Sequence, residues 1–343
     1  MAIKLSELAQ RIGCRMSGDD CLIENVADIN HAEQGRLAFV YNPKYLDAIR
    51  SSKASAIILK EEWLPKCDKP ALISDNPRLA FAKVAKLLNP VVYSFHGVST
   101  SACIASDVTV PDSVNIAENV VIDSGVILGE NIVIDACVVL SKDVEIADNV
   151  YIHPNVSIGQ GTKIGSHCTI YSGVVIGADG FGYVRDDDGY LKVPQLGNVI
   201  IGANVDIGAN TTIDRGALLD TVIHDGVKLD NQIQVAHNVE IGEHTVISAC
   251  AAIGGSVKIG KNCLIGGAVG IRDNIEITDN VVITGRTFVT SSIKESGSYS
   301  SSMLLDTTRN WKRNVTRLKS LDEIVKRLKT LENNVYKNNM DSD

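Results

Sequence analysis

His237 is the residue whose type and position most directly suggest chemistry. It lies in the segment QVAHNVEIG, residues 234–242, two residues after Val235 in a stretch dominated by Val and Ile. An imidazole titrates near neutrality, so it can take a proton from an attacking nucleophile. Asp230, seven residues earlier, is expected to lie close enough to orient the ring and stabilise the imidazolium. The alternative interpretation is a surface histidine on a turn.

A six-residue repeat must position this histidine. Aliphatic residues stand at every sixth position from Ile104 to Ile176 and again from Ile223 to Val289, with a second small or apolar residue two positions earlier. Such spacing points two side chains of each short strand inward. Hexapeptide periodicity is typical of a parallel β-helix, in which three hexads close one triangular coil. We therefore expect a mainly β fold, with His237 projecting from the rod near a corner.

Residues 1–98, before the repeat, have mixed character. Helical patterns are expected near residues 5–13 and over 77–88, and a strand over 56–60. This segment is predicted to be a separate small α/β domain.

The repeat occupies residues 99–305 and is interrupted by an insertion at 177–199. The insertion begins with a GxxGxG sequence that does not follow a Rossmann strand and open a helix, so we interpret it as a flexible insertion that can reach a neighbouring subunit. Residues 306–343 predict a C-terminal helical extension. Its apolar residues recur at spacings of three and four, as in an amphipathic or coiled-coil seam: Leu321, Ile324, Leu328, Leu331 and Val335.

Composition and charge argue against several classes of protein. The 343 residues carry a formal net charge of −8, which does not favour nucleic acid as a partner. Neither a secretory signal nor eighteen consecutive apolar residues is present, so we expect no integral membrane segment and a cytoplasmic location. The eight cysteines have no CxxC spacing, which predicts buried free thiols, with no disulfides and no metal site. We also expect no permanently bound cofactor.

The C-terminal segment departs from this acidic character. Between Arg309 and Lys329 there are eight basic residues and two acidic ones. An exposed basic patch favours an acidic partner, whereas the alternative is a set of solvated helix charges.

Several stretches together resemble one enzyme family. They are FVYNPKY (39–45), DNQIQVAHN (230–238), PQLGNVIIGANVDIGANTTIDRGAL, the terminal SMLLDTTRNWKR and the hexapeptide rod itself. Over nearly the whole chain they are similar to the UDP-3-O-(3-hydroxyacyl)glucosamine N-acyltransferases. The resemblance implies a left-handed β-helix, a homotrimer of parallel rods, and transfer of a 3-hydroxyacyl chain from the phosphopantetheine of acyl carrier protein to the 2-amino group of UDP-acylglucosamine in lipid A biosynthesis.

The resemblance also implies roles for the residues around the histidine. His237 corresponds to the general base and Asp230 to its supporting carboxylate, while the backbone N–H of Gly255 would bind the oxyanion. On the residues alone, Gly255 is equally a turn glycine. Because no Ser or Cys stands beside His237 in the matched motif, direct attack without an acyl-enzyme is expected.

The resemblance implies a set of substrate-binding residues as well. Phe39, Asn42 and Tyr45 match a uridine pocket that combines an aromatic face, an amide for the uracil edge and a phenol, and their spacing is expected to place them on one helical face. Without the resemblance, the two aromatics would be assigned to the domain core. Gln234 lies in the matched histidine motif. Asn274 stands where the family often carries a second histidine, so it can donate a hydrogen bond but cannot share proton transfer.

Two further sites concern the acyl donor. Phe288, near the end of the rod, is expected to limit chain length in an apolar groove between subunits. The residues expected to bind the acidic carrier protein are basic and lie in the C-terminal segment: Arg313, Arg317, Lys319, Lys326 and Arg327.

Two rival functions remain open at this stage. An acetyl-CoA-dependent sugar N-acetyltransferase would use the same rod, but it would not explain FxxNxxY or the basic segment. A non-catalytic structural solenoid would need neither His237 nor Phe39. A zinc enzyme on this rod is not expected, because the seven histidines include no HxxxxH pair.

Overall fold

The computed structural model describes residues 2–90, 95–301 and 305–340, and the side chains of all these residues except 335–340. The chain divides into two units, Met1–Ser94 and Phe95–Asp343. The boundary expected at residue 98 falls just inside the second unit, where Val98 pairs with Ile116 of the first coil. The expected C-terminal extension belongs to this second unit.

The first unit is an α/β domain built on a five-stranded sheet. The strand order is β2-β7-β6-β5-β4, and all neighbours are parallel except β2 and β7. The elements of this unit are β1 (Ile3–Lys4), α1 (Leu5–Ile12), β2 (Arg15–Ser17), β3 (Leu22–Ile23), β4 (Asn25–Val26), β5 (Arg36–Phe39), η1 (Pro43–Tyr45), α2 (Leu46–Ser51), β6 (Ala56–Leu59), η2 (Glu61–Lys66), β7 (Ala71–Ile73) and α3 (Pro77–Leu88).

The expected α/β character of this unit is confirmed by α1, α3 and β6. All four residues of β6 are buried, as expected for a parallel strand covered on both faces. Two apolar clusters make up the core of the domain, one containing α1 and α3 and the other containing Ile49 of α2 and Trp63 of η2.

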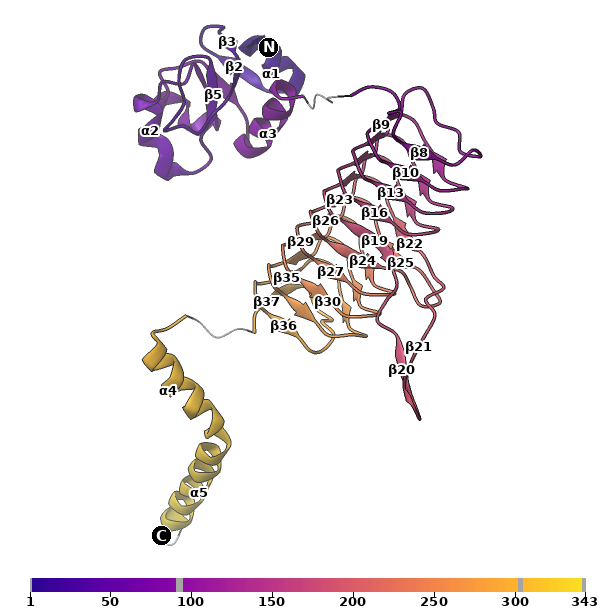
Figure 1. Ribbon diagram of the computed structural model, residues 1–343. Coiled ribbons are helices and arrows are strands. Elements are labelled where there is room, and N and C mark those ends of the chain that lie inside the picture. The colour runs from indigo at the N-terminus through magenta and orange to yellow at the C-terminus, as the bar shows by residue number, and fades with distance from the viewer. Residues whose placement is uncertain (1, 91–94, 302–304, 341–343) are drawn as a thin grey trace. The chain divides into compact units, whose positions relative to one another are not determined.

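The second unit is built on a left-handed parallel β-helix (Figure 1), as expected. Three parallel sheets run along the rod, and the chain passes from sheet 3 to sheet 1 to sheet 2 in each coil. Sheet 1 contains β8 (Cys103–Ile104), β10 (Val121–Ile122), β13 (Val139–Leu140), β16 (Ser157–Ile158), β19 (Val175–Ala178), β24 (Thr212–Asp214), β27 (Gln234–Val235), β30 (Ala252–Ile253), β33 (Gly270–Ile271) and β36 (Phe288–Val289).

Sheets 2 and 3 complete the triangular section. Sheet 2 contains β11 (Ile127–Leu128), β14 (Glu145–Ile146), β17 (Lys163–Ile164), β22 (Val199–Ile201), β25 (Thr221–Ile223), β28 (Glu240–Ile241), β31 (Lys258–Ile259) and β34 (Glu276–Ile277). Sheet 3 contains β9 (Asn115–Ile116), β12 (Val133–Ile134), β15 (Tyr151–Ile152), β18 (Thr169–Ile170), β23 (Asp206–Ile207), β26 (Lys228–Leu229), β29 (Val246–Ile247), β32 (Leu264–Ile265), β35 (Val281–Ile283) and β37 (Gly297–Tyr299).

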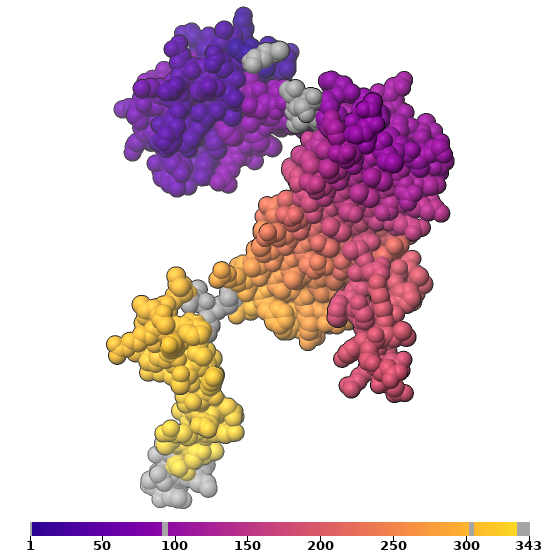
Figure 2. Space-filling model, in the orientation of Figure 1, coloured from indigo at the N-terminus to yellow at the C-terminus, as the bar shows by residue number. Residues whose placement is uncertain are grey.

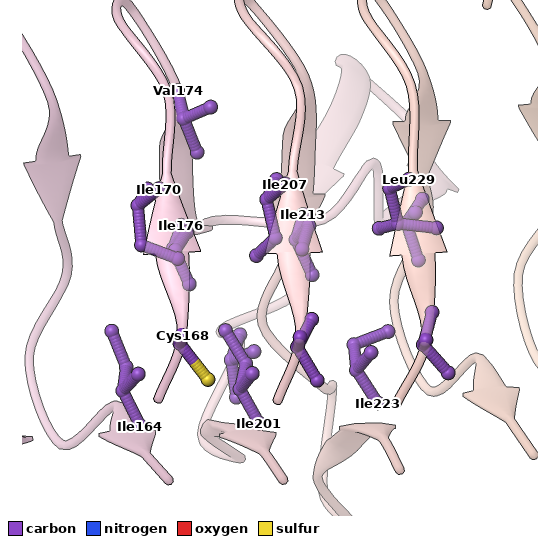
Figure 3. Close-up of a cluster of buried hydrophobic side chains, with 14 of the residues drawn as sticks. Ile164, Cys168, Ile170, Val174, Ile176, Ile201, Ile207, Ile213, Ile223 and Leu229 are labelled. Atoms are coloured by element: carbon purple, nitrogen blue, oxygen red, sulfur yellow. The ribbon is translucent and has the colours of Figure 1, made fainter. Parts of the chain in front are cut away.

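The six-residue repeat determines both the core and the corners of the rod. In register, Ile213 pairs with Val235 and Val235 with Ile253, so aliphatic side chains stack in columns inside the coils (Figure 3). Burying each such side chain stabilises the fold by about 1.5–3 kcal/mol. The corners place one residue in the left-handed region, for example Asn238 at φ 60°, and Asn adopts that backbone more readily than most residues.

The insertion at 177–199 leaves the rod after β19, at the corner between sheets 1 and 2. Its tip is a hairpin of β20 (Tyr183–Asp186) and β21 (Gly189–Lys192) that stands out from the rod surface (Figure 2). Its base is tied to the rod, because the Leu196 N–H donates to the Ala217 carbonyl and the Gly197 N–H donates to the Gly216 carbonyl. The insertion is therefore ordered at its base rather than flexible throughout.

The C-terminal extension forms α4 (Thr308–Lys319) and α5 (Leu321–Met340). The predicted seam residues Leu321, Ile324, Leu328 and Leu331 are about half exposed on α5, whereas the side chain of Val335 lies outside the described ones. No described helix is both long enough and apolar enough to cross a membrane.

All eight cysteines are free thiols, as expected. The expected burial holds fully only for Cys168 and Cys263. Cys14, Cys21 and Cys67 are partly buried, and Cys103, Cys137 and Cys250 are exposed, so the expectation is wrong for these last three.

Candidate active site

His237 lies two residues after β27, at the corner where the chain passes from sheet 1 to sheet 2. Its side chain is half-buried. The insertion leaves the rod at this same corner two coils earlier, because β19 pairs with β24 and β24 pairs with β27. The break in the repeat and the histidine are therefore neighbours in space.

Two glycines flank the imidazole. A Cβ atom on Gly255 would lie 2.8 Å from both Nε2 and Cε1 of His237, and a Cβ atom on Gly180 would lie 2.7 Å from its Cβ and 3.0 Å from its Cδ2. Gly255 belongs to the next coil and Gly180 to the insertion. The structure thus brings Gly255 to His237, and within the described residues its N–H donates no hydrogen bond.

Asp230 does not support the imidazole, so the expected pairing is wrong. It follows β26 at the corner between sheets 3 and 1, where its carboxylate accepts hydrogen bonds from the backbone N–H groups of Asn231 (2.8 Å) and Ala249 (3.0 Å). Each hexad ends at a different corner of the triangle, so a separation of one hexad plus one residue places Asp230 one corner away from His237.

Asp214 is the carboxylate whose charge acts on His237 through space, without a direct hydrogen bond or ion pair among the described residues. It ends β24 directly after Ile213, the partner of Val235, and therefore leads into the same corner one coil earlier. The side chain is buried, and its Oδ2 accepts a hydrogen bond from Nε2 of Gln234 at 2.9 Å. Burial raises the pKa of Asp214, against the lowering effects of the Gln234 hydrogen bond and the His237 charge. The repeat changes phase between Ile213 and Ile223, and this was the one sequence signal near Asp214.

Gln195, three residues after β21 on the return path of the insertion, is a second residue that the sequence did not indicate. It is 7% exposed, and its Nε2 donates to the Val193 carbonyl at 3.1 Å. Its Oε1 is buried with no hydrogen-bond partner among the described residues. A Cβ atom on Gly180 would lie 2.8 Å from this oxygen. Because an unpaired buried acceptor costs about 1–3 kcal/mol, we expect water or substrate to supply a donor here.

Asn274 and Phe288 lie farther along the same part of the rod. The Asn274 N–H donates to the Gly255 carbonyl at 2.9 Å, and its Nδ2 donates to Asp273 at 2.8 Å. Phe288 ends an outward row on sheet 1 in which Gln234, Ala252, Gly270 and Phe288 pair in register. The row spans three strand spacings, roughly 14 Å, and its central side chains are small.

The FxxNxxY residues come together in the first unit, but not on one helical face as expected. Phe39 ends β5, Asn42 caps η1 by accepting the Lys44 N–H at 3.1 Å, and Tyr45 ends η1. Phe39 is also half-buried against Phe81, at 4.2 Å between ring centroids, as the core interpretation anticipated.

Tyr41 joins this cluster, although sequence reasoning did not select it. Its ring lies 5.6 Å from Phe39 and 5.9 Å from Tyr45 between centroids. The Arg78 guanidinium lies 3.9 Å from the Tyr41 ring centroid, and its hydrogen bond lowers the pKa of the phenol. Lys44 Nζ lies 4.7 Å from the Tyr45 ring centroid. Neither cation forms an ion pair with a carboxylate in the described part of the chain.

The predicted carrier-binding residues are all exposed on α4 and α5. They are Arg313, Arg317, Lys319, Lys326 and Arg327. Lys326 pairs with Asp322 at 2.7 Å. Among the residues that the structure describes, no cluster of three or more His, Cys, Asp or Glu side chains could hold a metal ion.

Comparison with known proteins first defines the class. Two hexapeptide models match the rod: the bacterial transferase hexapeptide over residues 143–178 and 220–255, and the hexapeptide repeat of succinyl-transferase over 108–142 and 256–291. A model described as UDP-3-O-(3-hydroxymyristoyl) glucosamine N-acyltransferase, LpxD, matches residues 20–87 of the first unit.

Full-length relatives then define the family. The UDP-3-O-acylglucosamine N-acyltransferase of Coxiella burnetii (strain Dugway 5J108-111) is 44% identical over 334 residues, which cover 97% of this chain and 98% of the relative. The enzyme of the same name from Alkalilimnicola ehrlichii is 42% identical, with 96% and 95% covered. A solved UDP-N-acetylglucosamine acyltransferase from Campylobacter jejuni is 23% identical and covers 57% of this chain and 68% of its own, with a TM-score of 0.46. The chain belongs to the UDP-3-O-acylglucosamine N-acyltransferase family and is an N-acyltransferase.

Proposed function

We propose that this chain transfers a 3-hydroxyacyl group from acyl carrier protein to the 2-amino group of UDP-3-O-(3-hydroxyacyl)glucosamine in lipid A biosynthesis, as a cytoplasmic homotrimer. The observation that carries the proposal is the imidazole of His237 held between Gly180 and Gly255, in a chain of this family. No permanent cofactor takes part, and acyl-phosphopantetheine is the co-substrate.

The reaction is a direct acyl transfer. The substrate amine attacks the thioester carbonyl carbon, forming the C–N bond, while the carbonyl oxygen becomes an oxyanion that accepts a hydrogen bond from the Gly255 N–H. His237 takes a proton from the attacking nitrogen. When the tetrahedral intermediate collapses, the C–S bond breaks and the leaving thiolate receives that proton. Buried Asp214 stabilises the imidazolium in between.

The proposed function and its main rival, an acetyl-CoA-dependent sugar N-acetyltransferase, differ in the acyl donor. The basic residues of α4 and α5 are exposed and suit an acidic carrier protein, whereas acetyl-CoA would not need them. Purified protein with UDP-3-O-acylglucosamine should yield the N-acylated nucleotide, identified by mass spectrometry, with 3-hydroxyacyl carrier protein as donor. Product from acetyl-CoA alone would favour the N-acetyltransferase, and product from neither would favour the structural solenoid.

Replacing Asp214 by Asn should separate stability from activity. Burial raises the pKa of the Asp214 carboxyl in the folded state. The folded protein therefore holds this proton more tightly than the unfolded chain does. As a result, the free energy of unfolding decreases as the pH rises from the pKa of the unfolded state through that of the folded state. At pH 7 the neutral amide should therefore raise Tm slightly, while kcat falls about tenfold because the imidazolium loses its counter-charge. Thermal unfolding at pH 4 and pH 7 and steady-state kinetics check this. A lower Tm at pH 7 would contradict it.

Replacing Tyr45 by Ala should weaken nucleotide binding. If the cluster of Phe39, Tyr41 and Tyr45 stacks on uracil, losing one ring should raise the Kd for UDP by about three- to tenfold. Isothermal titration with UDP measures this, and Leu22→Ala, a truncation of an exposed side chain in the same unit, is the control. The same Kd for UDP in the unmodified protein, Tyr45→Ala and Leu22→Ala would refute the proposed uridine pocket.

Replacing Phe288 by Ala should admit longer acyl donors. The ring is 60% exposed, and its Cδ2 lies 3.0 Å from where a Cβ atom of Gly270 would be, so it closes the row of small residues that begins beside His237. The comparison is with the donor that the unmodified protein prefers. For donors two or four carbons longer than this one, we expect Phe288→Ala to raise kcat/KM, relative to the preferred donor, by at least about tenfold. Leu264→Ala, on sheet 3 and 50% exposed, is the control. An unchanged chain preference would reject the role of Phe288.

A further inference from the structure

Asn238 makes an unusual set of contacts for a corner residue of this rod. Its backbone N–H donates to the Thr221 hydroxyl at 2.8 Å. Its side-chain Oδ1 accepts the Ala217 N–H at 3.0 Å, and its Nδ2 donates to the Leu219 carbonyl at 2.6 Å. The same Oδ1 lies 3.0 Å from Nδ1 of His237.

The two backbone groups determine which way the amide points. An N–H can only donate and a carbonyl can only accept. If the Asn238 amide were turned over, its NH₂ group would face the Ala217 N–H and its oxygen would face the Leu219 carbonyl, so both contacts would become repulsive. The atom beside His237 is therefore an oxygen, which can only accept.

This orientation decides the tautomer of the imidazole. A neutral ring carries one proton, and only a protonated Nδ1 can bond to Oδ1 of Asn238. The lone pair then resides on Nε2, and the Nε2–Cε1 edge is the one that faces Gly255. We propose that Asn238 is a positioning residue that holds His237 as the Nδ1–H tautomer, so that Nε2 is the free base at the oxyanion-binding glycine. The inference rests on the proposed role of His237 as general base.

Asparagine at a corner does not by itself imply this role. Asn262 adopts the same left-handed backbone, with φ 55°, and its side chain makes no hydrogen bond within the described residues. Asn238 differs because its amide is clamped by Ala217 and Leu219, which lie in the loop between β24 and β25 that is hydrogen-bonded to the base of the insertion. A structural cap would need those two backbone bonds but not the contact with the ring.

The tautomer can be read from the ¹⁵N solid-state NMR spectrum of the full chain labelled at histidine, at a pH of about 9, where imidazoles are neutral. The His237 signals are assigned by their loss in His237→Gln. We expect a protonated Nδ1 and an unprotonated Nε2. In Asn238→Gly, which keeps the left-handed backbone, the signals should show mixed tautomers, and kcat should fall roughly 10- to 100-fold with little change in KM, since a wrongly protonated base is inactive.

Two further variants separate positioning from folding. Asn238→Asp keeps an accepting Oδ1 beside Nδ1, so it should restore the Nδ1–H tautomer and part of kcat even though the bond to Leu219 is lost. Asn262→Gly, the matched corner control, should leave both the spectrum and kcat unchanged. A protonated Nε2 in the unmodified protein, or full kcat in Asn238→Gly, would overturn the inference. Activity retained in His237→Gln would instead contradict the proposed role of His237 as general base.

Discussion

His237→Gln is expected to lower kcat/KM by about 10²- to 10⁴-fold, the range that a positioned general base contributes. The side-chain amide of Gln is close to the imidazole in size and can form hydrogen bonds, but it cannot accept a proton from the substrate amine at neutral pH. The loss should appear mainly in kcat, because the residues of the proposed uridine pocket belong to the other unit and are unchanged. Steady-state assays with the carrier-protein donor measure the effect.

The matched control is His244→Gln. His244 is also a corner residue of the rod, with φ 59°, and Gln232 shows that Gln adopts this backbone at φ 58°. Both variants should unfold near the temperature of the unmodified protein, since neither imidazole is part of the buried core. Retained activity in His237→Gln, or an equal loss in both variants, would remove His237 from the mechanism.

Gly255→Ala is expected to have the second largest effect, roughly a 10- to 100-fold loss of kcat. The added Cβ would lie 2.8 Å from Nε2 and Cε1 of His237, so the imidazole must turn away from its place. A misplacement of about 1 Å at a reacting group can cost on the order of 10²-fold in rate. The Gly255 N–H itself is retained, and the φ of Gly255 is not in the left-handed region, so the backbone should accept alanine.

Gly267→Ala supplies the comparison for this steric argument. The nearest atom to a Cβ atom there is the Ala249 carbonyl oxygen at 3.3 Å, and no catalytic group is close. Both variants should show small, similar changes in Tm, with kcat reduced only in Gly255→Ala. If Gly255→Ala kept the kcat of the unmodified protein, the contact between Gly255 and the imidazole would have no bearing on the reaction.

Much of the fold could be predicted because its signals are local. An aliphatic residue at every sixth position can be buried in one way only, as a column inside stacked coils, and the pairing of Val235 with Ile253 eighteen residues later follows directly. The helices over residues 5–12 and 77–88 were likewise visible in their own periodicity. The selection of His237 came from the resemblance of the segment DNQIQVAHN to the family motif, since on the repeat alone the residue could be a surface histidine on a turn.

The neighbours of that histidine were not visible in the repeat. Counting hexads suggested Asp230, but a triangular coil turns at every hexad, so residues seven apart sit at different corners. Gln195 lies near His237 because the insertion leaves the rod at that corner, and Asp214 does so because coil stacking brings the end of β24 to the same corner. The one-helical-face arrangement of Phe39, Asn42 and Tyr45 failed for a related reason, since the chain changes from strand to turn between them.

By itself the amino-acid sequence determined that the second unit is a hexapeptide rod and selected His237 within it, because hydrophobic periodicity and short motifs act over a few residues and are written directly in the chain. Only the tertiary structure decided which groups surround that imidazole: a glycine from the next coil, a glycine and an amide from the insertion, and a buried carboxylate from the coil before. Those contacts join segments far apart in sequence, and they depend on where coil stacking brings each corner, which no local pattern encodes.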